Sequence, residues 1–79
     1  MTASITIYGR HSCPQCAATV RKARELGLAY TYVDLDDDIA AAARLLAQNY
    51  RGLPVVEAGD QAWCGYWPAR LEKVRDQNA

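Results

Sequence analysis

Two cysteines two residues apart, Cys13 and Cys16, stand where a strand-like segment gives way to a helix-like one. Residues 4–8 alternate apolar and polar side chains and are rich in β-branched residues, which predicts a strand. After a loop at residues 9–12, Pro14 suits the first position of a helix, because the N–H it lacks would be unpaired there in any case. The pair is therefore expected at a strand-to-helix junction, which limits the folds open to the chain.

The rest of the chain continues the alternation of strands and helices. We predict helices over residues 14–26, 39–50 and from 67 onward, and further strands over residues 29–33, 53–57 and 61–63. The inward helix faces are expected to be Ala17, Val20 and Ala23, then Ile39, Ala42, Ala43, Leu46 and Tyr50, and finally Trp67, Leu71 and Val74. The order β-α-β-α-β-β-α implies a parallel first strand pair with a right-handed crossover, followed by an antiparallel hairpin. We expect an α/β fold with a mixed four-stranded sheet flanked by three helices.

Size and charge exclude several classes of protein. The chain has 79 residues, which is room for one domain spanning residues 1–79. Nine Lys and Arg balance nine Asp and Glu, whereas a nucleic-acid binder would show a basic excess. No run approaches the roughly 18 apolar residues that a membrane helix needs, and the N-terminus lacks the features of a signal peptide. We expect a monomeric cytoplasmic protein with no membrane or nucleic-acid partner.

The placement of the cysteine pair indicates redox chemistry. Cys13 at a helix N-terminus faces unpaired N–H groups and the positive end of the helix dipole, and both stabilise a thiolate over a thiol. The thiolate is the attacking species in disulfide exchange. Cys13 is therefore the expected nucleophile, and Cys16, one turn further in, the resolving cysteine. The residues expected to shape this site are Arg10, His11, Pro14 and Gln15.

A metal site is the alternative use of such a pair. Structural zinc needs four ligands, usually from a second Cys/His pair at fixed spacing. Cys64 and His11 are the other candidates, and they form no such pair. We therefore expect no metal and no cofactor beyond a redox-active Cys13–Cys16 disulfide. A metal-binding or interaction module without turnover on the same fold stays open as an alternative of another class.

Three segments give the chain a resemblance to a known family. They are the Cys13-Pro14-Gln15-Cys16 run, the Leu53-Pro54-Val55-Val56 run and the Trp63-Cys64-Gly65-Tyr66-Trp67-Pro68 run. On these residues the chain resembles the glutaredoxin-like branch of the thioredoxin fold, and most closely the NrdH-type redoxins. The resemblance implies that Pro54 is cis and packs beside the Cys13 sulfur, although the residues alone favour an ordinary trans proline at an edge-strand start. It also implies that the backbone of Leu53 is free to pair with a bound partner.

The resemblance further implies partners. Members of this family take electrons from thioredoxin reductase and deliver them to ribonucleotide reductase, whereas true glutaredoxins use glutathione. Residues 65–69 hold no Asp or Glu where glutaredoxins hold the amine of glutathione, which favours a protein partner. A glutathione-dependent dithiol glutaredoxin is the alternative, and Pro14 is the glutaredoxin-like choice after the first cysteine. The residues implied in partner binding are Leu53, Pro54, Trp63, Cys64, Gly65, Tyr66 and Trp67.

Other residues carry weaker expectations. Cys64 stands where the family usually has Ser, and we interpret it as a small buried residue, with a third redox thiol as the alternative. Trp63 is expected in the core, while Trp67 fits a core or a partner surface equally well. We interpret the acidic run at residues 34–38 as the solvated start of a helix.

Overall fold

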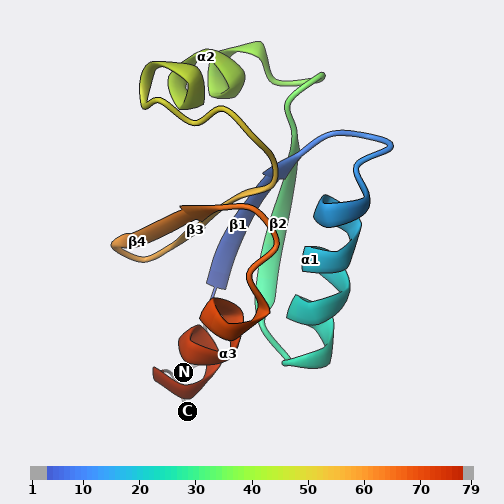
Figure 1. Ribbon diagram of the computed structural model, residues 1–79, viewed down its shortest axis with the longest axis vertical. Coiled ribbons are helices and arrows are strands. Elements are labelled where there is room, and N and C mark those ends of the chain that lie inside the picture. The colour runs from blue at the N-terminus through green and yellow to red at the C-terminus, as the bar shows by residue number, and fades with distance from the viewer. Residues whose placement is uncertain (1–3, 78–79) are drawn as a thin grey trace.

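The computed structural model describes residues 4–77, and its elements follow the predicted order (Figure 1). In chain order they are β1 (Ser4–Gly9), α1 (Pro14–Glu25), β2 (Ala29–Asp34), α2 (Ile39–Ala47), β3 (Val55–Ala58), β4 (Gln61–Cys64) and α3 (Pro68–Gln77). The strands form one sheet in the order β2-β1-β3-β4, in which β1 and β2 are parallel and the other pairs are antiparallel. The predicted α/β fold with a mixed four-stranded sheet is confirmed.

The core lies on both faces of the sheet. On one face Ile5, Ile7 and Val56 pack with residues of α1 and α3, and Leu71 of α3 is fully buried there. On the other face Leu45 of α2 packs into a smaller cluster of buried residues. That cluster comprises Tyr8, Leu35, Leu45 and Val55. Figure 1 accordingly shows α2 well away from α1 and α3.

The inward face predicted for α1 is wrong in part. The buried residues of this helix are Cys16, Thr19 and Ala23, whereas Ala17 is exposed and Val20 is half-buried. Thr19 was missed because it is polar. Its hydroxyl donates to the Gln15 carbonyl oxygen at 2.8 Å, so the side chain is buried without an unpaired polar atom.

The inward face predicted for α2 is also wrong in part, although Ala42 and Tyr50 are half-buried against the smaller cluster as predicted. Ile39 and Leu46 are 81% and 58% exposed, and Leu45 is the buried residue of the helix. The helix ends at Ala47, three residues before the predicted end, because Asn49 has a positive φ of 69° and breaks the helical path. This short helix packs against the sheet through Leu45, with Ala41 and Ala42 half-buried beside it, while its larger apolar residues Ile39 and Leu46 face outward.

Trp67 is also misplaced in the prediction. It precedes α3 and is 49% exposed, so it does not share the inward face of that helix. Leu71 and Val74 are buried as predicted. Within residues 4–77, no helix has both the length and the apolar character that crossing a membrane requires.

A polar network ties α2 to the sheet. Arg44 of α2 donates to the Tyr8 hydroxyl at 2.8 Å and to the Glu57 carboxylate at 3.1 Å. The Tyr8 hydroxyl in turn donates to Glu57 at 2.9 Å. Burial, followed by the hydrogen bond to Glu57 and its negative charge, raises the pKa of Tyr8 above the ordinary 10.0. The network joins α2, β1 and β3 through three side chains.

The topology brings the predicted site segments to one edge of the sheet. Because β3 is antiparallel to both β1 and β4, the C-terminal ends of β1 and β4 lie together with the N-terminal end of β3. The loop to Cys13 leaves from the end of β1, Pro54 directly precedes β3, and Cys64 ends β4.

Candidate active site

The cysteine pair lies at the start of α1, as the sequence predicts. Cys13 is the N-cap residue, with extended backbone angles of −113° and 101°, and Pro14 is the first helical residue. The Cys13 sulfur accepts a hydrogen bond from the backbone N–H of Cys16 at 3.2 Å. Cys13 and Cys16 form a disulfide with Cα atoms 5.2 Å apart. The first helical turn thus directs an N–H donor at the sulfur that is expected to attack.

The two cysteines differ in exposure. Cys13 is half-buried at the surface, whereas Cys16 is 1% exposed. A substrate disulfide can therefore reach the Cys13 sulfur, while Cys16 is accessible only to its neighbour. This difference is what the roles of nucleophile and resolving cysteine require.

The loop before Cys13 is held by the C-terminal end of β2 and by the segment that follows it. Arg10 forms an ion pair with Asp36 at 3.4 Å, and His11 contacts Asp34 at 2.9 Å. The Tyr32 hydroxyl donates to the Arg10 carbonyl oxygen at 3.1 Å. Arg10 and His11 thus pair with the acidic run, and their contribution to the site is the position of the loop.

The same acidic run offers the ligand atoms of a possible cation site. One ligand atom each from His11, Asp34 and Asp37 lie within 4.8 Å of one another. The His11 Nε2 atom lies 2.9 Å from one Asp34 carboxylate oxygen, and the other Asp34 oxygen accepts a hydrogen bond from the Asp36 N–H at 2.8 Å. We interpret these residues as a contact between the loop before Cys13 and the acidic run, and we assign them no metal.

The proline segment lies at the same edge of the sheet. The Leu53–Pro54 peptide bond is cis, which is the isomer that the family resemblance implies. Pro54 is buried, and its carbonyl oxygen accepts a hydrogen bond from the Gly65 N–H at 2.7 Å. Leu53 is half-buried against the α2 side of the core. Gly65 has a φ of 96°, which side-chain-bearing residues rarely adopt, so the close turn after β4 depends on glycine.

Gln15 connects the cysteine segment to the turn after β4. Its side-chain oxygen accepts a hydrogen bond from the Tyr66 N–H at 3.4 Å. Gln15 is exposed and directly precedes the buried Cys16. Three segments far apart in sequence, around Cys13, Pro54 and Gly65, are therefore linked at one edge.

Cys64 is exposed and unpaired, so the expectation that it is buried is wrong. Along β4 the side chains alternate, and Trp63 takes the inward position at 4% exposed. Cys64 is the last residue of an edge strand and points to the opposite side, where it remains open to solvent.

The aromatic residues divide between core and surface. Trp63 is in the core as predicted, whereas Tyr66 and Trp67 are 40% and 49% exposed. The Arg70 guanidinium lies 4.9 Å from the Trp63 ring centre and 5.1 Å from that of Trp67. Arg70 thus makes cation–π contacts with both indoles, and its contact with the buried Trp63 helps to fix the orientation of the exposed Trp67.

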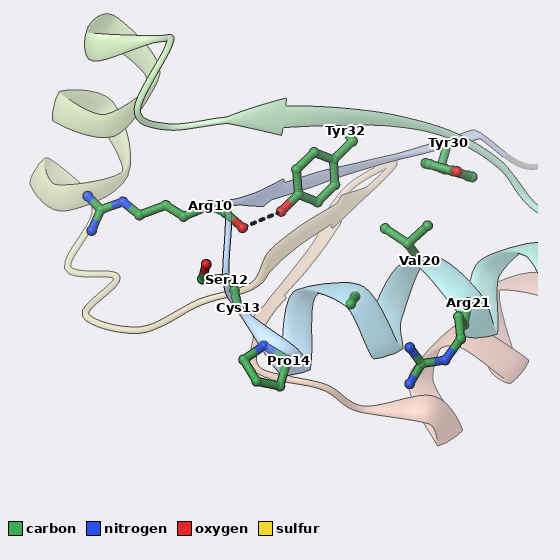
Figure 2. Close-up of a pocket in the computed structure, with 9 residues that line it drawn as sticks. Arg10, Ser12, Cys13, Pro14, Val20, Arg21, Tyr30 and Tyr32 are labelled. Carbon is green, nitrogen blue, oxygen red and sulfur yellow. Dashed lines mark hydrogen bonds between the residues drawn. The ribbon is translucent and has the colours of Figure 1, made fainter.

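An open groove runs beside Cys13 between α1 and β2 (Figure 2). Its volume is about 830 Å³, and its lining residues are Arg10, Ser12, Cys13, Pro14, Ala17, Val20, Arg21, Tyr30 and Tyr32. Burial, and then the charge of Asp34, raises the pKa of Tyr32 above 10.0. Sequence reasoning treated Tyr30 and Tyr32 only as strand formers and missed their place beside the cysteine pair.

Comparisons with known proteins agree with this geometry. A family model described as "Glutaredoxin" matches residues 5–63. The glutaredoxin-like protein NrdH of Salmonella typhimurium is 44% identical over 71 residues, covering 90% of this chain and 88% of that protein. The glutaredoxin-like protein NrdH of Escherichia coli strain K12 is 41% identical over 70 residues, covering 89% of this chain and 86% of that protein. The solved structure of NrdH-redoxin from Escherichia coli, described as having a thioredoxin-like activity profile, superposes with a TM-score of 0.86 at 41% identity, covering 89% of this chain and 92% of that one.

Proposed function

Since the chain belongs to the glutaredoxin family, as an NrdH-type redoxin, we propose that it takes electrons from thioredoxin reductase and passes them to ribonucleotide reductase. It is a thioredoxin-like dithiol carrier, a thiol–disulfide oxidoreductase whose Cys13–Cys16 disulfide is the redox centre. Its partners are redox proteins. That these partners are thioredoxin reductase and ribonucleotide reductase is our proposal. The cytoplasm, where thiols are kept reduced, is the compartment that we propose for this exchange.

We propose that the carrier works in two steps. In the reduced protein the Cys13 thiolate attacks one sulfur of a substrate disulfide, and the other substrate sulfur leaves as a thiolate. The Cys16 thiolate then attacks the Cys13 sulfur, which forms the intramolecular disulfide and releases the second substrate thiolate. Two electrons pass to the substrate, and the reductase returns two electrons to the pair. The observation that carries the proposal is the contrast between an accessible Cys13 at the helix N-cap and a buried Cys16.

A protein donor is favoured by the surface after β4. A glutathione site needs charged groups that hold the tripeptide, and residues 65–69 contain no Asp or Glu. Trp67 instead places an exposed indole there, next to Tyr66. Exposed aromatic side chains are typical anchors of protein interfaces. We therefore propose that Trp67, Tyr66 and the backbone of Leu53 contact the partner proteins.

The test is a comparison of donors. The oxidised protein is supplied either with NADPH and thioredoxin reductase or with NADPH, glutathione and glutathione reductase, and reduction of a disulfide substrate is followed by NADPH consumption. We expect turnover with thioredoxin reductase and little with glutathione. Turnover that depends on glutathione and not on thioredoxin reductase would overturn the proposed donor while leaving the dithiol chemistry in place.

A further inference from the structure

Gly9, the last residue of β1, lies between the Tyr32 hydroxyl and the Cys16 sulfur, two groups that are far apart in the sequence. A Cβ atom built on Gly9 would lie 2.8 Å from the Cys16 sulfur and closer still to the Tyr32 hydroxyl oxygen. Contacts under 3.0 Å are essentially never made by real Cβ atoms, so a side chain at this position would push one of the two groups away. The absence of a side chain at Gly9 therefore lets the Tyr32 hydroxyl approach the Cys16 sulfur.

The pairing of β1 with β2 fixes this approach. The two strands are parallel, with Ile7 opposite Tyr32 and Gly9 opposite Asp34. Ile7 and Tyr32 thus stand side by side, and Ile7 belongs to the core cluster that α1 also joins. The phenol of Tyr32 consequently extends along the sheet toward Arg10 in the loop that leads to Cys13, as Figure 2 shows.

In the disulfide form the Tyr32 hydroxyl has a different acceptor. It donates to the Arg10 carbonyl oxygen at 3.1 Å, which Figure 2 marks with a dashed line. A hydroxyl carries one hydrogen and turns freely about its C–O bond, so it can exchange one acceptor for another without moving the ring. Arg10 is exposed, so water can replace the hydroxyl at its carbonyl oxygen.

The resolving step requires a thiolate at Cys16, and a thiolate is a strong hydrogen-bond acceptor. Cys16 is 1% exposed, and a buried thiolate is costly unless a donor faces it. We propose that the Tyr32 hydroxyl turns from the Arg10 carbonyl to the Cys16 sulfur and donates a hydrogen bond to its thiolate during the resolving step. The inference rests on the proposed function, because it takes Cys16 to be the resolving cysteine.

The chemistry balances with Tyr32 as donor only. Cys16 loses its proton to solvent, and solvent returns a proton to the substrate thiolate that leaves Cys13. The Cys16 thiolate then forms the bond to Cys13 as the Cys13–substrate bond breaks. Tyr32 keeps its proton throughout, because burial and the nearby charge of Asp34 raise its pKa above 10.0. The charged and titratable groups around this junction are Tyr30, Tyr32 and Asp34 of β2, Arg10 and His11 of the loop, Cys13, and Arg21 of α1.

The experiment follows the two steps separately. The reduced protein carrying Cys64→Ser is mixed with dithiobis(nitrobenzoate), whose coloured thiolate is released once when Cys13 attacks and once more when Cys16 resolves the mixed disulfide. Tyr32→Phe removes the hydroxyl and keeps the ring. Tyr30→Phe is the matched control, because the Tyr30 hydroxyl lies on the same strand but accepts from Arg24 at 3.0 Å.

We expect Tyr32→Phe to leave the first release unchanged. The second release should slow about tenfold at neutral pH, and its pH profile should move upward by about one unit, as the loss of one hydrogen bond to a charged group predicts. Tyr30→Phe should change neither release. An unshifted second release in Tyr32→Phe, or an equal slowing in Tyr30→Phe, would overturn the inference. Absence of a second release from the protein with both tyrosines intact would instead contradict the role of Cys16 in the proposed function.

Discussion

The sulfur of Cys13 accepts a hydrogen bond from the backbone N–H of Cys16 at 3.2 Å. The two cysteines of the redox disulfide are thus also the acceptor and the donor of the N-cap hydrogen bond of α1. A thiolate at Cys13 keeps this donor after the disulfide is reduced, and the dipole of α1 adds to its stabilisation. The N-cap is therefore the structural source of the reactivity that we propose for Cys13.

The first prediction concerns the order in which the three thiols react. In the reduced protein, limiting iodoacetamide at neutral pH should modify Cys13 first, Cys64 second and Cys16 last. Cys13 has the helix N-cap, Cys64 is exposed without one, and Cys16 is buried. Mass spectrometry of peptides taken over time gives the three rates, with Cys64 as the internal reference. Faster modification of Cys64 than of Cys13 would show that the helix start does not activate the thiol.

The second prediction concerns the exposed indole. Trp67→Ala should raise the KM for a protein disulfide substrate about tenfold or more, because a buried interface Trp commonly contributes that much. The rate with a small disulfide should stay the same, since Trp67 is not part of the cysteine pair. Ile39→Ala is the matched control, because Ile39 is also large, apolar and exposed but lies on α2. Equal effects of the two substitutions on KM would exclude a specific role for Trp67.

The third prediction concerns the attachment of α2. Arg44→Ala should lower the free energy of unfolding by about 1 kcal/mol, because it removes donors to Tyr8 and Glu57 at a half-exposed site. Arg75→Ala removes an exposed ion pair with the adjacent Asp76 and should change stability little. Urea unfolding of the two variants measures both values. A loss for Arg44→Ala no larger than that for Arg75→Ala would mean that the network does not hold the helix.

The fourth prediction concerns alkaline pH. The folded pKa of Tyr8 is raised above its unfolded value of 10.0, so the folded state holds this proton more tightly than the unfolded chain does. The stability that follows is fully present below pH 10 and is lost as the pH rises through the folded pKa. Urea unfolding across this range should show stability falling above pH 10, with a shallower fall in Tyr8→Phe. An identical slope in Tyr8→Phe would contradict the shift.

Local sequence signals predict the elements and the cysteine pair well. The junction at Cys13 can be read from adjacent residues, because Pro14 and the strand before the loop define both sides of it. The cis isomer of the bond before Pro54 came from family resemblance, since the local sequence alone favours trans. Trp63 is buried, as its place in the alternation of β4 indicates.

The errors concern contacts that depend on how elements pack. The α2 face was misjudged at Ile39 and Leu46, because helical periodicity shows which residues share a face and not which part of that face meets the sheet. Cys64 was misjudged because the preference of cysteine for buried positions does not tell whether the residue ends an edge strand, as Cys64 does, with its side chain exposed. Tyr32 was missed because its approach to Cys16 depends on the parallel register of β1 and β2. A glycine at the end of a strand, Gly9, was the one local signal, since such a residue often marks a close approach.

The central claim is that Cys13 attacks and Cys16 resolves, and trapping tests it most directly. With a protein disulfide substrate, Cys13→Ser should lose reductase activity, while Cys16→Ser should accumulate a mixed disulfide between Cys13 and the substrate. Non-reducing electrophoresis and mass spectrometry of the linked peptide identify the bond. Accumulation at Cys13 in Cys16→Ser with no turnover in Cys13→Ser is the predicted result, and full disulfide reductase turnover by Cys13→Ser would contradict the account.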